Sequence, residues 1–277
     1  KGRWVEVDQD KLGQALEHWK KVEAEAKEGR IGFIEGMRLL AGASTDLQQE
    51  ESEDRRRWVH VGAGNALQQT LNQLRDPSSL QGAGTPLGIT AELRPYQLEG
   101  MNWMAFVTGL GLGACLADDM GLGKTLQVLA LLARRNGNSG SNPALLIIPA
   151  SLLGNWKNEA EAFAPGLKLK TVHPSEISRK ELQELAGDVQ NRLSAYDLVV
   201  TTYSMVHRLT WLREMTWSLI ILDEAQAIKN PSTRQTRAVK KLPAQARIAL
   251  TGTPIENRLG DLWSLFDFLN PGLLGSS

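Results

Sequence analysis

Hydrophobic and polar residues follow two different patterns along the chain, and the change falls near Leu93. After that point, short apolar runs alternate with stretches in which apolar residues recur every three or four positions. The runs predict strands at residues 113–116, 144–148, 167–172, 197–201, 217–222 and 247–250. The predicted helices span residues 95–109 and 126–133, and others begin near residues 151, 175, 203, 232 and 257. Nearly continuous apolar strands alternating with helices favour an α/β fold with a mainly parallel sheet covered on both faces.

Residues 1–85 are predicted to form a small, mostly helical accessory segment. Its predicted helices span residues 10–28, 36–41 and 65–75. Pro, Ser and Gly are frequent in residues 76–88, which is the composition of a linker. We therefore expect the domain boundary there and one large domain over residues 90–277. Nothing in the accessory segment indicates a function for it.

The composition is that of an ordinary globular protein. The 277 residues carry 31 basic and 31 acidic side chains, so any attraction for a polyanion has to be local. No apolar run approaches the ~18 residues of a membrane helix, and no signal peptide is evident, so we expect no membrane partner and a cytoplasmic location. The single cysteine, Cys115, excludes an intramolecular disulfide and is expected to be a buried small hydrophobe. The four scattered histidines predict no structural metal site. Because the chain opens on Lys1, we expect it to be a piece of a longer protein.

The stretch ADDMGLGKT, residues 117–125, lies between a predicted strand and a predicted helix. Free backbone N–H groups and the helix dipole at a helix start favour a polyanion, and Gly121 and Gly123 let the backbone approach it closely. Lys124 would reach the β- and γ-phosphates of a nucleotide, and the Thr125 hydroxyl would take a place on Mg²⁺. The strict pattern opens with glycine, whereas Asp118 stands there. The predicted cradle residues are Asp119, Met120, Gly121, Leu122, Gly123, Lys124, Thr125 and Leu126.

An apolar run at residues 217–222 ends in the acid pair Asp223 and Glu224. One acid at a strand end commonly caps a helix, but two acids after four aliphatics, downstream of a cradle, favour catalysis. Asp223 would hold the Mg²⁺, and Glu224 would orient and deprotonate the attacking water. The predicted catalytic residues are therefore Lys124, Asp223 and Glu224.

Residues 225–255 contain no acid but carry six basic side chains: Lys229, Arg234, Arg237, Lys240, Lys241 and Arg247. In a neutral protein, a stretch of +6 beside a nucleotide site predicts an edge that faces a polyanion. A merely solvated helix is the alternative. We expect Lys229 to contact nucleic acid.

Six motifs occur in order over residues 93–270. They are LRPYQ at 93–97, the cradle, IIPASLLGNW at 147–156, VVTTY at 199–203, DEAQ at 223–226 and LTGTPIEN at 250–257. This series resembles the first lobe of the Swi/Snf-type ATPases, the chromatin-remodelling and DNA-translocating branch of helicase superfamily two. The resemblance implies a RecA-like three-layer sandwich that binds ATP and Mg²⁺, moves along double-stranded DNA and acts on a DNA-bound protein. Residues 1–85 are loosely similar to the region that precedes the ATPase in bacterial members.

The resemblance also implies roles for single residues. Gln97 would read adenine, and Trp156 is expected to be a packing residue rather than a stacking platform. Contacts to the nucleic-acid backbone are implied for Ser151, Asn155, Thr201 and Thr202. Coupling of the γ-phosphate state to domain movement is implied for Gln226, Thr251, Gly252 and Thr253. Members of the family place ATP between two lobes, with arginine fingers from the second, so we expect little or no turnover from this lobe alone.

Two other functions stay open at this point. One is a strand-separating helicase of the same superfamily acting on RNA or DNA. The other is a nucleotide-gated platform on which a partner protein docks. The location would be the nucleoid in a bacterium and the nucleus in a eukaryote.

Overall fold

A computed structural model describes residues 65–80, 84–135, 142–253 and 259–274. The chain divides into two compact units, residues 1–63 and residues 64–277. The first unit, with the helices predicted over residues 10–28 and 36–41, lies outside the described residues. Helix α3 (Asn65–Arg75), which we placed in the accessory segment, is grouped with the second unit.

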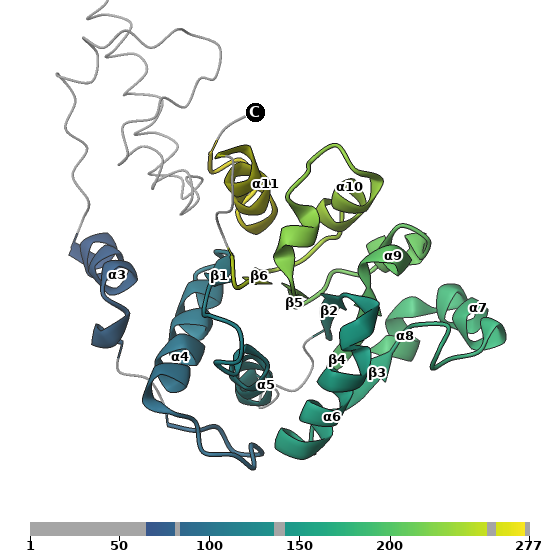
Figure 1. Ribbon diagram of the computed structural model, residues 1–277, viewed down its shortest axis with the longest axis horizontal. Coiled ribbons are helices and arrows are strands. Elements are labelled where there is room, and N and C mark those ends of the chain that lie inside the picture. The colour runs from purple at the N-terminus through teal and green to yellow at the C-terminus, as the bar shows by residue number, and fades with distance from the viewer. Residues whose placement is uncertain (1–64, 81–83, 136–141, 254–258, 275–277) are drawn as a thin grey trace, which may run out of the picture. The chain divides into compact units, whose positions relative to one another are not determined.

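The centre of the second unit is a six-stranded sheet in which every pair of neighbouring strands is parallel. The strand order is β1-β6-β5-β2-β4-β3. The strands are β1 (Ala114–Leu116), β2 (Ala144–Ile148), β3 (Leu169–Thr171), β4 (Leu198–Thr202), β5 (Leu219–Leu222) and β6 (Arg247–Leu250). The cradle follows β1 and the acid pair follows β5, with β6 between them (Figure 1). In a parallel sheet the carboxyl ends of the strands share one edge, where ligands bind.

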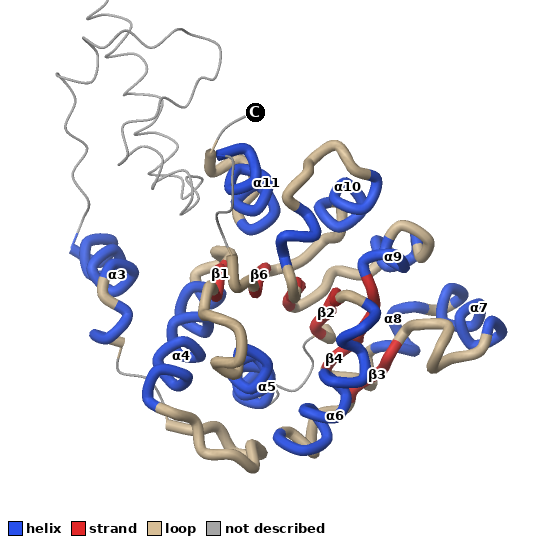
Figure 2. Tube along the Cα trace, in the orientation of Figure 1, coloured by secondary structure: helices blue, strands red, loops and turns tan. Residues whose placement is uncertain are grey.

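Helices cover both faces of the sheet (Figures 1 and 2). On one face lie α4 (Pro95–Gly109), α5 (Lys124–Arg135) and α6 (Leu153–Phe163), packed against Leu146 and Ile148 of β2. Leu145 and Ile147 of the same strand point into the second core, on the other face. That face is covered by α7 (Arg179–Gly187), α8 (Val189–Leu193), α9 (Tyr203–Val206), α10 (Arg234–Lys240) and α11 (Leu259–Leu269). Short 3₁₀ turns complete the unit: η2 (Pro77–Ser79), η3 (Ala150–Leu152), η4 (Thr210–Arg213) and η5 (Ala225–Ile228). The predicted three-layer α/β fold is confirmed.

Several predicted bounds differ from the structure for identifiable reasons. β5 begins at Leu219 rather than at Trp217, which forms only an isolated bridge with Ala244. The helix expected near residue 175 begins at Arg179, because the Ser178 hydroxyl caps it by accepting a hydrogen bond from the Glu181 N–H. The helix expected from residue 126 begins at Lys124, so the end of the cradle is already helical.

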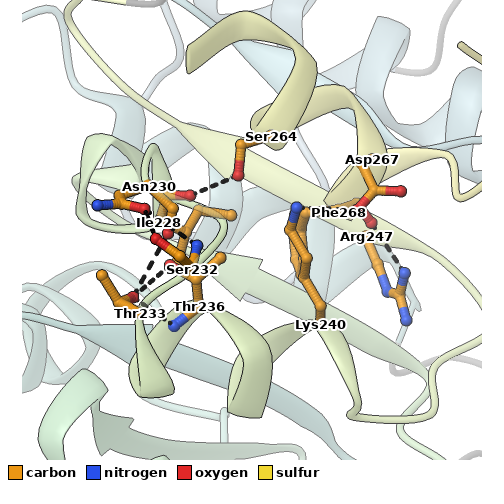
Figure 3. Close-up of polar contacts among 10 residues, drawn as sticks. All are labelled: Ile228, Asn230, Ser232, Thr233, Thr236, Lys240, Arg247, Ser264, Asp267 and Phe268. Carbon is orange, nitrogen blue, oxygen red and sulfur yellow. Dashed lines mark hydrogen bonds and ion pairs between the residues drawn. The ribbon is translucent and has the colours of Figure 1, made fainter. Parts of the chain in front are cut away.

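Helix α11 is fastened to η5, α10 and β6 by polar contacts (Figure 3). The Ser264 hydroxyl donates to the Ile228 carbonyl at 2.7 Å. Lys240 and Asp267 form an ion pair at 2.8 Å, and Arg247 donates to the Phe268 carbonyl at 2.8 Å. These contacts support the chain segment that follows the acid pair.

Replacing Ser264 with alanine is expected to lower the free energy of unfolding by about 1–3 kcal/mol. Ser264 is 0% exposed, so the variant would leave the carbonyl of Ile228 buried without this donor. Urea denaturation of both proteins measures the difference. The control is Ser194→Ala, in which an exposed hydroxyl donates to the Asn191 carbonyl and where about 0.5 kcal/mol or less is expected. Equal losses in the two variants would contradict the assigned contribution of the buried bond.

Cys115 is half-buried in β1 and packs against the hydrophobic core. Burial raises the pKa of its thiol to about 11, so the thiolate is scarce near neutral pH. Within the described ranges, no helix combines the length and the apolar character that crossing a membrane requires.

Candidate active site

The cradle closes over the ammonium group of Lys124, the first residue of α5. Its Nζ donates to the carbonyl oxygens of Asp118, at 2.6 Å, and Asp119, at 2.9 Å. Gly121 and Gly123 have φ angles of 84° and 76°, in the left-handed region that side chains with a Cβ disfavour. The lysine therefore lies inside the curve of the loop, where a phosphate would meet both its charge and the start of α5.

Gln97 lies against this loop from α4. Its Oε1 accepts from the Arg94 N–H at 2.9 Å, and its Nε2 donates to the Leu122 carbonyl at 3.1 Å. The Tyr96 hydroxyl donates to the same carbonyl at 3.2 Å. A Cβ placed on Gly123 would come within 2.5 Å of the Gln97 Nε2, so glycine is needed there for this approach. The predicted adenine reader thus lies beside the cradle and holds the loop.

Asp223, at the end of β5, is held from several sides. Its Oδ1 accepts from the Glu224 N–H at 2.9 Å, and its Oδ2 accepts from the Trp156 indole N–H at 2.8 Å. Its carbonyl oxygen accepts from the Tyr203 hydroxyl at 2.8 Å. Burial raises the pKa of the carboxyl, while both N–H donors and the charge of Lys124 act to lower it. The structure therefore brings Lys124 and Asp223 into one electrostatic environment, although 99 positions separate them in the sequence.

Glu224 has an unusual backbone conformation. Its φ of 52° and ψ of 54° place it in the left-handed region, and it is the one described residue other than glycine with a positive φ. Such a conformation costs a non-glycine residue roughly 1–3 kcal/mol, and strain of this kind concentrates at functional sites. The half-buried carboxylate accepts a hydrogen bond from the Gln226 side-chain amide.

A third carboxylate, which the sequence analysis missed, lies beside the predicted metal ligands. Glu159 of α6 lies close enough to Thr125 and Asp223 for both to act on its pKa. Burial raises the pKa of Glu159, hydrogen bonding to the Thr125 side chain lowers it, and the negative charge of Asp223 raises it. Trp156, one turn earlier on α6, is 2% exposed, which confirms that it packs in the core. Its hydrogen bond to Asp223 was also missed. The available signal was the spacing of three between Trp156 and Glu159, which places both on one face of a helix.

The residues expected to contact nucleic acid fall into two groups. Ser151, Asn155 and Lys229 are exposed. Thr201 and Thr202 are 0% and 1% exposed, and the Thr201 hydroxyl donates to the Val172 carbonyl at 2.9 Å. Both side chains are therefore buried in this conformation, and the contact of these two residues with a nucleic-acid backbone stays a prediction. Their neighbour Ser204 is exposed.

The residues expected to couple the nucleotide state to movement lie next to the acid pair. The Thr251 hydroxyl donates to the Gln226 Oε1 at 3.1 Å and accepts from the Thr253 N–H at 3.1 Å. Because Gln226 also bonds to Glu224, a continuous chain of hydrogen bonds runs from Glu224 to Thr253. Gly252 lies within this segment, between the two threonines.

The basic stretch at residues 225–255 is only partly available to a polyanion. Lys240 is paired with Asp267 and lies 5.1 Å from the centre of the Trp263 ring. Arg247 donates to the carbonyls of Phe268 and Leu242. These two cations stabilise the fold around α11 (Figure 3). The exposed cations of the stretch are Lys229, Arg234, Arg237 and Lys241.

The side chains present fit a magnesium–nucleotide complex better than a metal ion alone. Among the described residues, no group of three or more His, Cys, Asp or Glu side chains could hold a metal. Mg²⁺ is instead held in such sites by one or two protein oxygens together with phosphates and water. Thr125 and Asp223 supply a hydroxyl and a buried carboxylate, and a cation beside Asp223 would offset the cost of its burial.

Comparisons with known proteins agree with this geometry. The family of SNF2-related domains matches residues 96–277. YwqA of Bacillus subtilis, named as an ATP-dependent helicase/translocase, is 37% identical over 280 residues, which cover 100% of this chain and 30% of YwqA. The TATA-binding protein-associated factor MOT1 of Saccharomyces cerevisiae is 39% identical over 74% of this chain and 11% of its own length. The SWI2/SNF2 ATPase core of Sulfolobus solfataricus in complex with dsDNA superposes with a TM-score of 0.62 at 47% identity, covering 71% of this chain and 39% of that one. The chain thus spans less than a third of the length of these two sequence relatives.

Proposed function

The chain belongs to the SNF2-related ATPase family, and on that premise we propose that it is the first ATP-binding lobe of a double-stranded DNA translocase. The observation that carries the proposal is that the cradle after β1 and Asp223 after β5 lie at the carboxyl edge of one sheet, where the charge of Lys124 acts to lower the pKa of Asp223. A phosphate-facing lysine and a buried aspartate at strand ends on the same edge of a parallel sheet are what ATP hydrolysis with Mg²⁺ requires.

The residues of this chain would divide the work as follows. The curve of the cradle and the start of α5 would bind the β- and γ-phosphates, with Lys124 neutralising their charge. Thr125 and Asp223 would hold Mg²⁺, which supplies charge neutralisation across the phosphates when it is bound. Glu224 would orient a water molecule and accept its proton. When Glu224 accepts this proton, its hydrogen bond with Gln226 would change. Gln226 and Thr251 would transmit that change to the segment that follows β6.

The proposal that duplex DNA is the track follows from two observations. A structural relative in the family was solved with dsDNA. Exposed polar and basic side chains also gather on the elements after β2 and β5: Ser151, Asn155, Lys229, Arg234 and Arg237. Side chains of these kinds suit phosphodiester oxygens and carry no sequence preference. In the full-length protein the lobe would hold DNA without reading it, and a DNA-bound protein would be the object that is moved.

A strand-separating helicase is the second candidate, because YwqA is named as a helicase/translocase. A helicase releases one strand of a labelled duplex. A translocase displaces a third strand from a triplex and leaves the duplex paired.

The ATPase rate of the full-length protein, measured with duplex DNA, single-stranded DNA and RNA across a salt series, tests the proposal. We expect duplex DNA to give the largest stimulation. DNA binding should weaken with salt, with a slope of log K against log [salt] near −0.9 for each phosphate neutralised. Stimulation by single strands or RNA alone, with strand release, would favour the helicase. A rate that no nucleic acid changes would overturn both.

A further inference from the structure

Two buried aromatic side chains from different elements donate hydrogen bonds to the same aspartate. The Trp156 indole N–H reaches the Asp223 carboxylate, and the Tyr203 hydroxyl reaches the Asp223 main-chain carbonyl, each at 2.8 Å. Trp156 is 2% exposed and Tyr203 is 5% exposed, so water does not compete for either bond. The side chain and the backbone of Asp223 are therefore each held by a donor from outside its own strand.

Each aromatic residue also belongs to a segment that presents polar groups to the surface. Trp156 lies in α6 directly after the exposed Asn155, and the exposed Ser151 lies in η3, the turn that precedes this helix. Tyr203 is the first residue of α9, and the exposed Ser204 follows it. Both segments start at the carboxyl ends of neighbouring strands, β2 and β4. A single aromatic residue thus spans the distance from each exposed segment to the buried aspartate.

Helix α6 also places a second side chain beside the predicted metal ligands. Glu159, one turn after Trp156, lies close enough to Thr125 for that side chain to act on its pKa. The two residues expected to hold Mg²⁺, Asp223 and Thr125, therefore both lie next to one face of α6. A shift of this helix would move a partner of each of them.

We propose that Trp156 and Tyr203 are positioning residues that tie the two nucleic-acid-facing segments to Asp223, so that a duplex held at these segments strengthens Mg²⁺-dependent nucleotide binding. The inference rests on the proposed function of the lobe. Groups that orient a metal ligand through hydrogen bonds commonly change metal affinity roughly 10–100-fold when they are removed. Neither residue would touch the nucleotide or the metal.

Trp217 separates this role from simple packing. It is 0% exposed, and its indole N–H donates to the Leu212 carbonyl at 2.9 Å. It lies in the core between the sheet and helices α7 to α11, whereas Trp156 lies in the core on the other face. Like Trp156→Phe, Trp217→Phe removes one indole N–H donor and the same side-chain volume, but it leaves the hydrogen bonds of Asp223 in place. It is the matched control for the loss of a buried tryptophan.

The experiment measures the Mg²⁺ concentration at which full-length protein reaches half-maximal binding of a fluorescent ADP, with and without a short DNA duplex. Trp156→Phe is expected to raise this concentration roughly 10–100-fold and to reduce the shift that the duplex produces in the wild type. Tyr203→Phe, which removes a single hydroxyl, should change both quantities in the same direction. Mn²⁺ binding followed by electron paramagnetic resonance gives the metal affinity directly, and circular dichroism checks that each variant is folded.

The outcomes separate the inference from the function on which it rests. If the Mg²⁺ midpoints and duplex shifts of Trp156→Phe and Tyr203→Phe match those of Trp217→Phe, the positioning role is overturned and the motor function stands. If wild-type binding of the ADP is insensitive to Mg²⁺, the proposed function fails and the inference fails with it. If Trp156→Phe does not fold, Tyr203→Phe alone decides in the same way.

Discussion

Replacing Glu224 with glutamine in the full-length protein is expected to lower kcat about 10²–10⁴-fold while ATP binding is retained. Glutamine keeps the size of the side chain and its ability to accept a hydrogen bond, but it cannot take a proton from water. The phosphates would still meet the cradle and Lys124, so the affinity for ATP should change little. The left-handed backbone at Glu224 fixes where its carboxylate points, and the glutamine variant inherits that geometry.

Single-turnover hydrolysis and equilibrium binding of ATP measure the two quantities separately. Glu161→Gln is the matched control, because Glu161 is an exposed acid on α6, outside the acid pair. It should leave both quantities at wild-type values. Loss of ATP affinity in Glu224→Gln equal to the loss of kcat would show that the carboxylate serves binding rather than proton transfer. An unchanged biological activity in this variant would favour the docking platform, which needs nucleotide binding but no hydrolysis.

The fold could be predicted well because its central strands are buried on both faces. Strands β2 and β6 have the predicted bounds, since runs such as ALLII leave no solvent-facing alternation that could be confused with a helix. Strand β3 is shorter than predicted, Leu169–Thr171 against residues 167–172, because it lies at the sheet edge and pairs only with β4. Helix α4 also has its predicted bounds, set by Pro95 at its first position.

The site could be predicted only where its residues are adjacent in sequence. The cradle and the acid pair are each contiguous, so their types and order are visible in the chain. The indole of Trp156 and the carboxylate of Glu159 come to the site from α6, a separate element, and the sequence does not state which residues α6 will contact. Thr201 and Thr202 show a further limit, because a hydroxyl side chain in a motif does not reveal that it will be buried in the folded strand.

The positive charges near Asp223 bear on how fast the 277-residue chain would hydrolyse ATP by itself. In the described part of the chain, the positive charge that acts on Asp223 is that of Lys124. Two described arginines form hydrogen bonds away from Asp223: Arg134 donates to Asn102, and Arg247 donates to two carbonyls near α11. The chain covers 39% of a solved ATPase core of its family. The family resemblance assigns the arginine that neutralises charge in the transition state to the second lobe, and such an arginine contributes roughly 10³–10⁵ in kcat.

We therefore expect the 277-residue chain alone to hydrolyse ATP roughly 10³–10⁵ times more slowly than the full-length protein at saturating duplex DNA. The measurement is phosphate release under identical conditions, with circular dichroism showing that the shorter chain is folded. Lys124→Ala in the same chain defines the background, because it removes the charge that faces the phosphates. Brisk, DNA-stimulated turnover of the chain that Lys124→Ala abolishes would mean that one lobe holds every group the reaction needs. The transition-state charge would then have to be neutralised by groups of this lobe, with Lys124 as the first candidate.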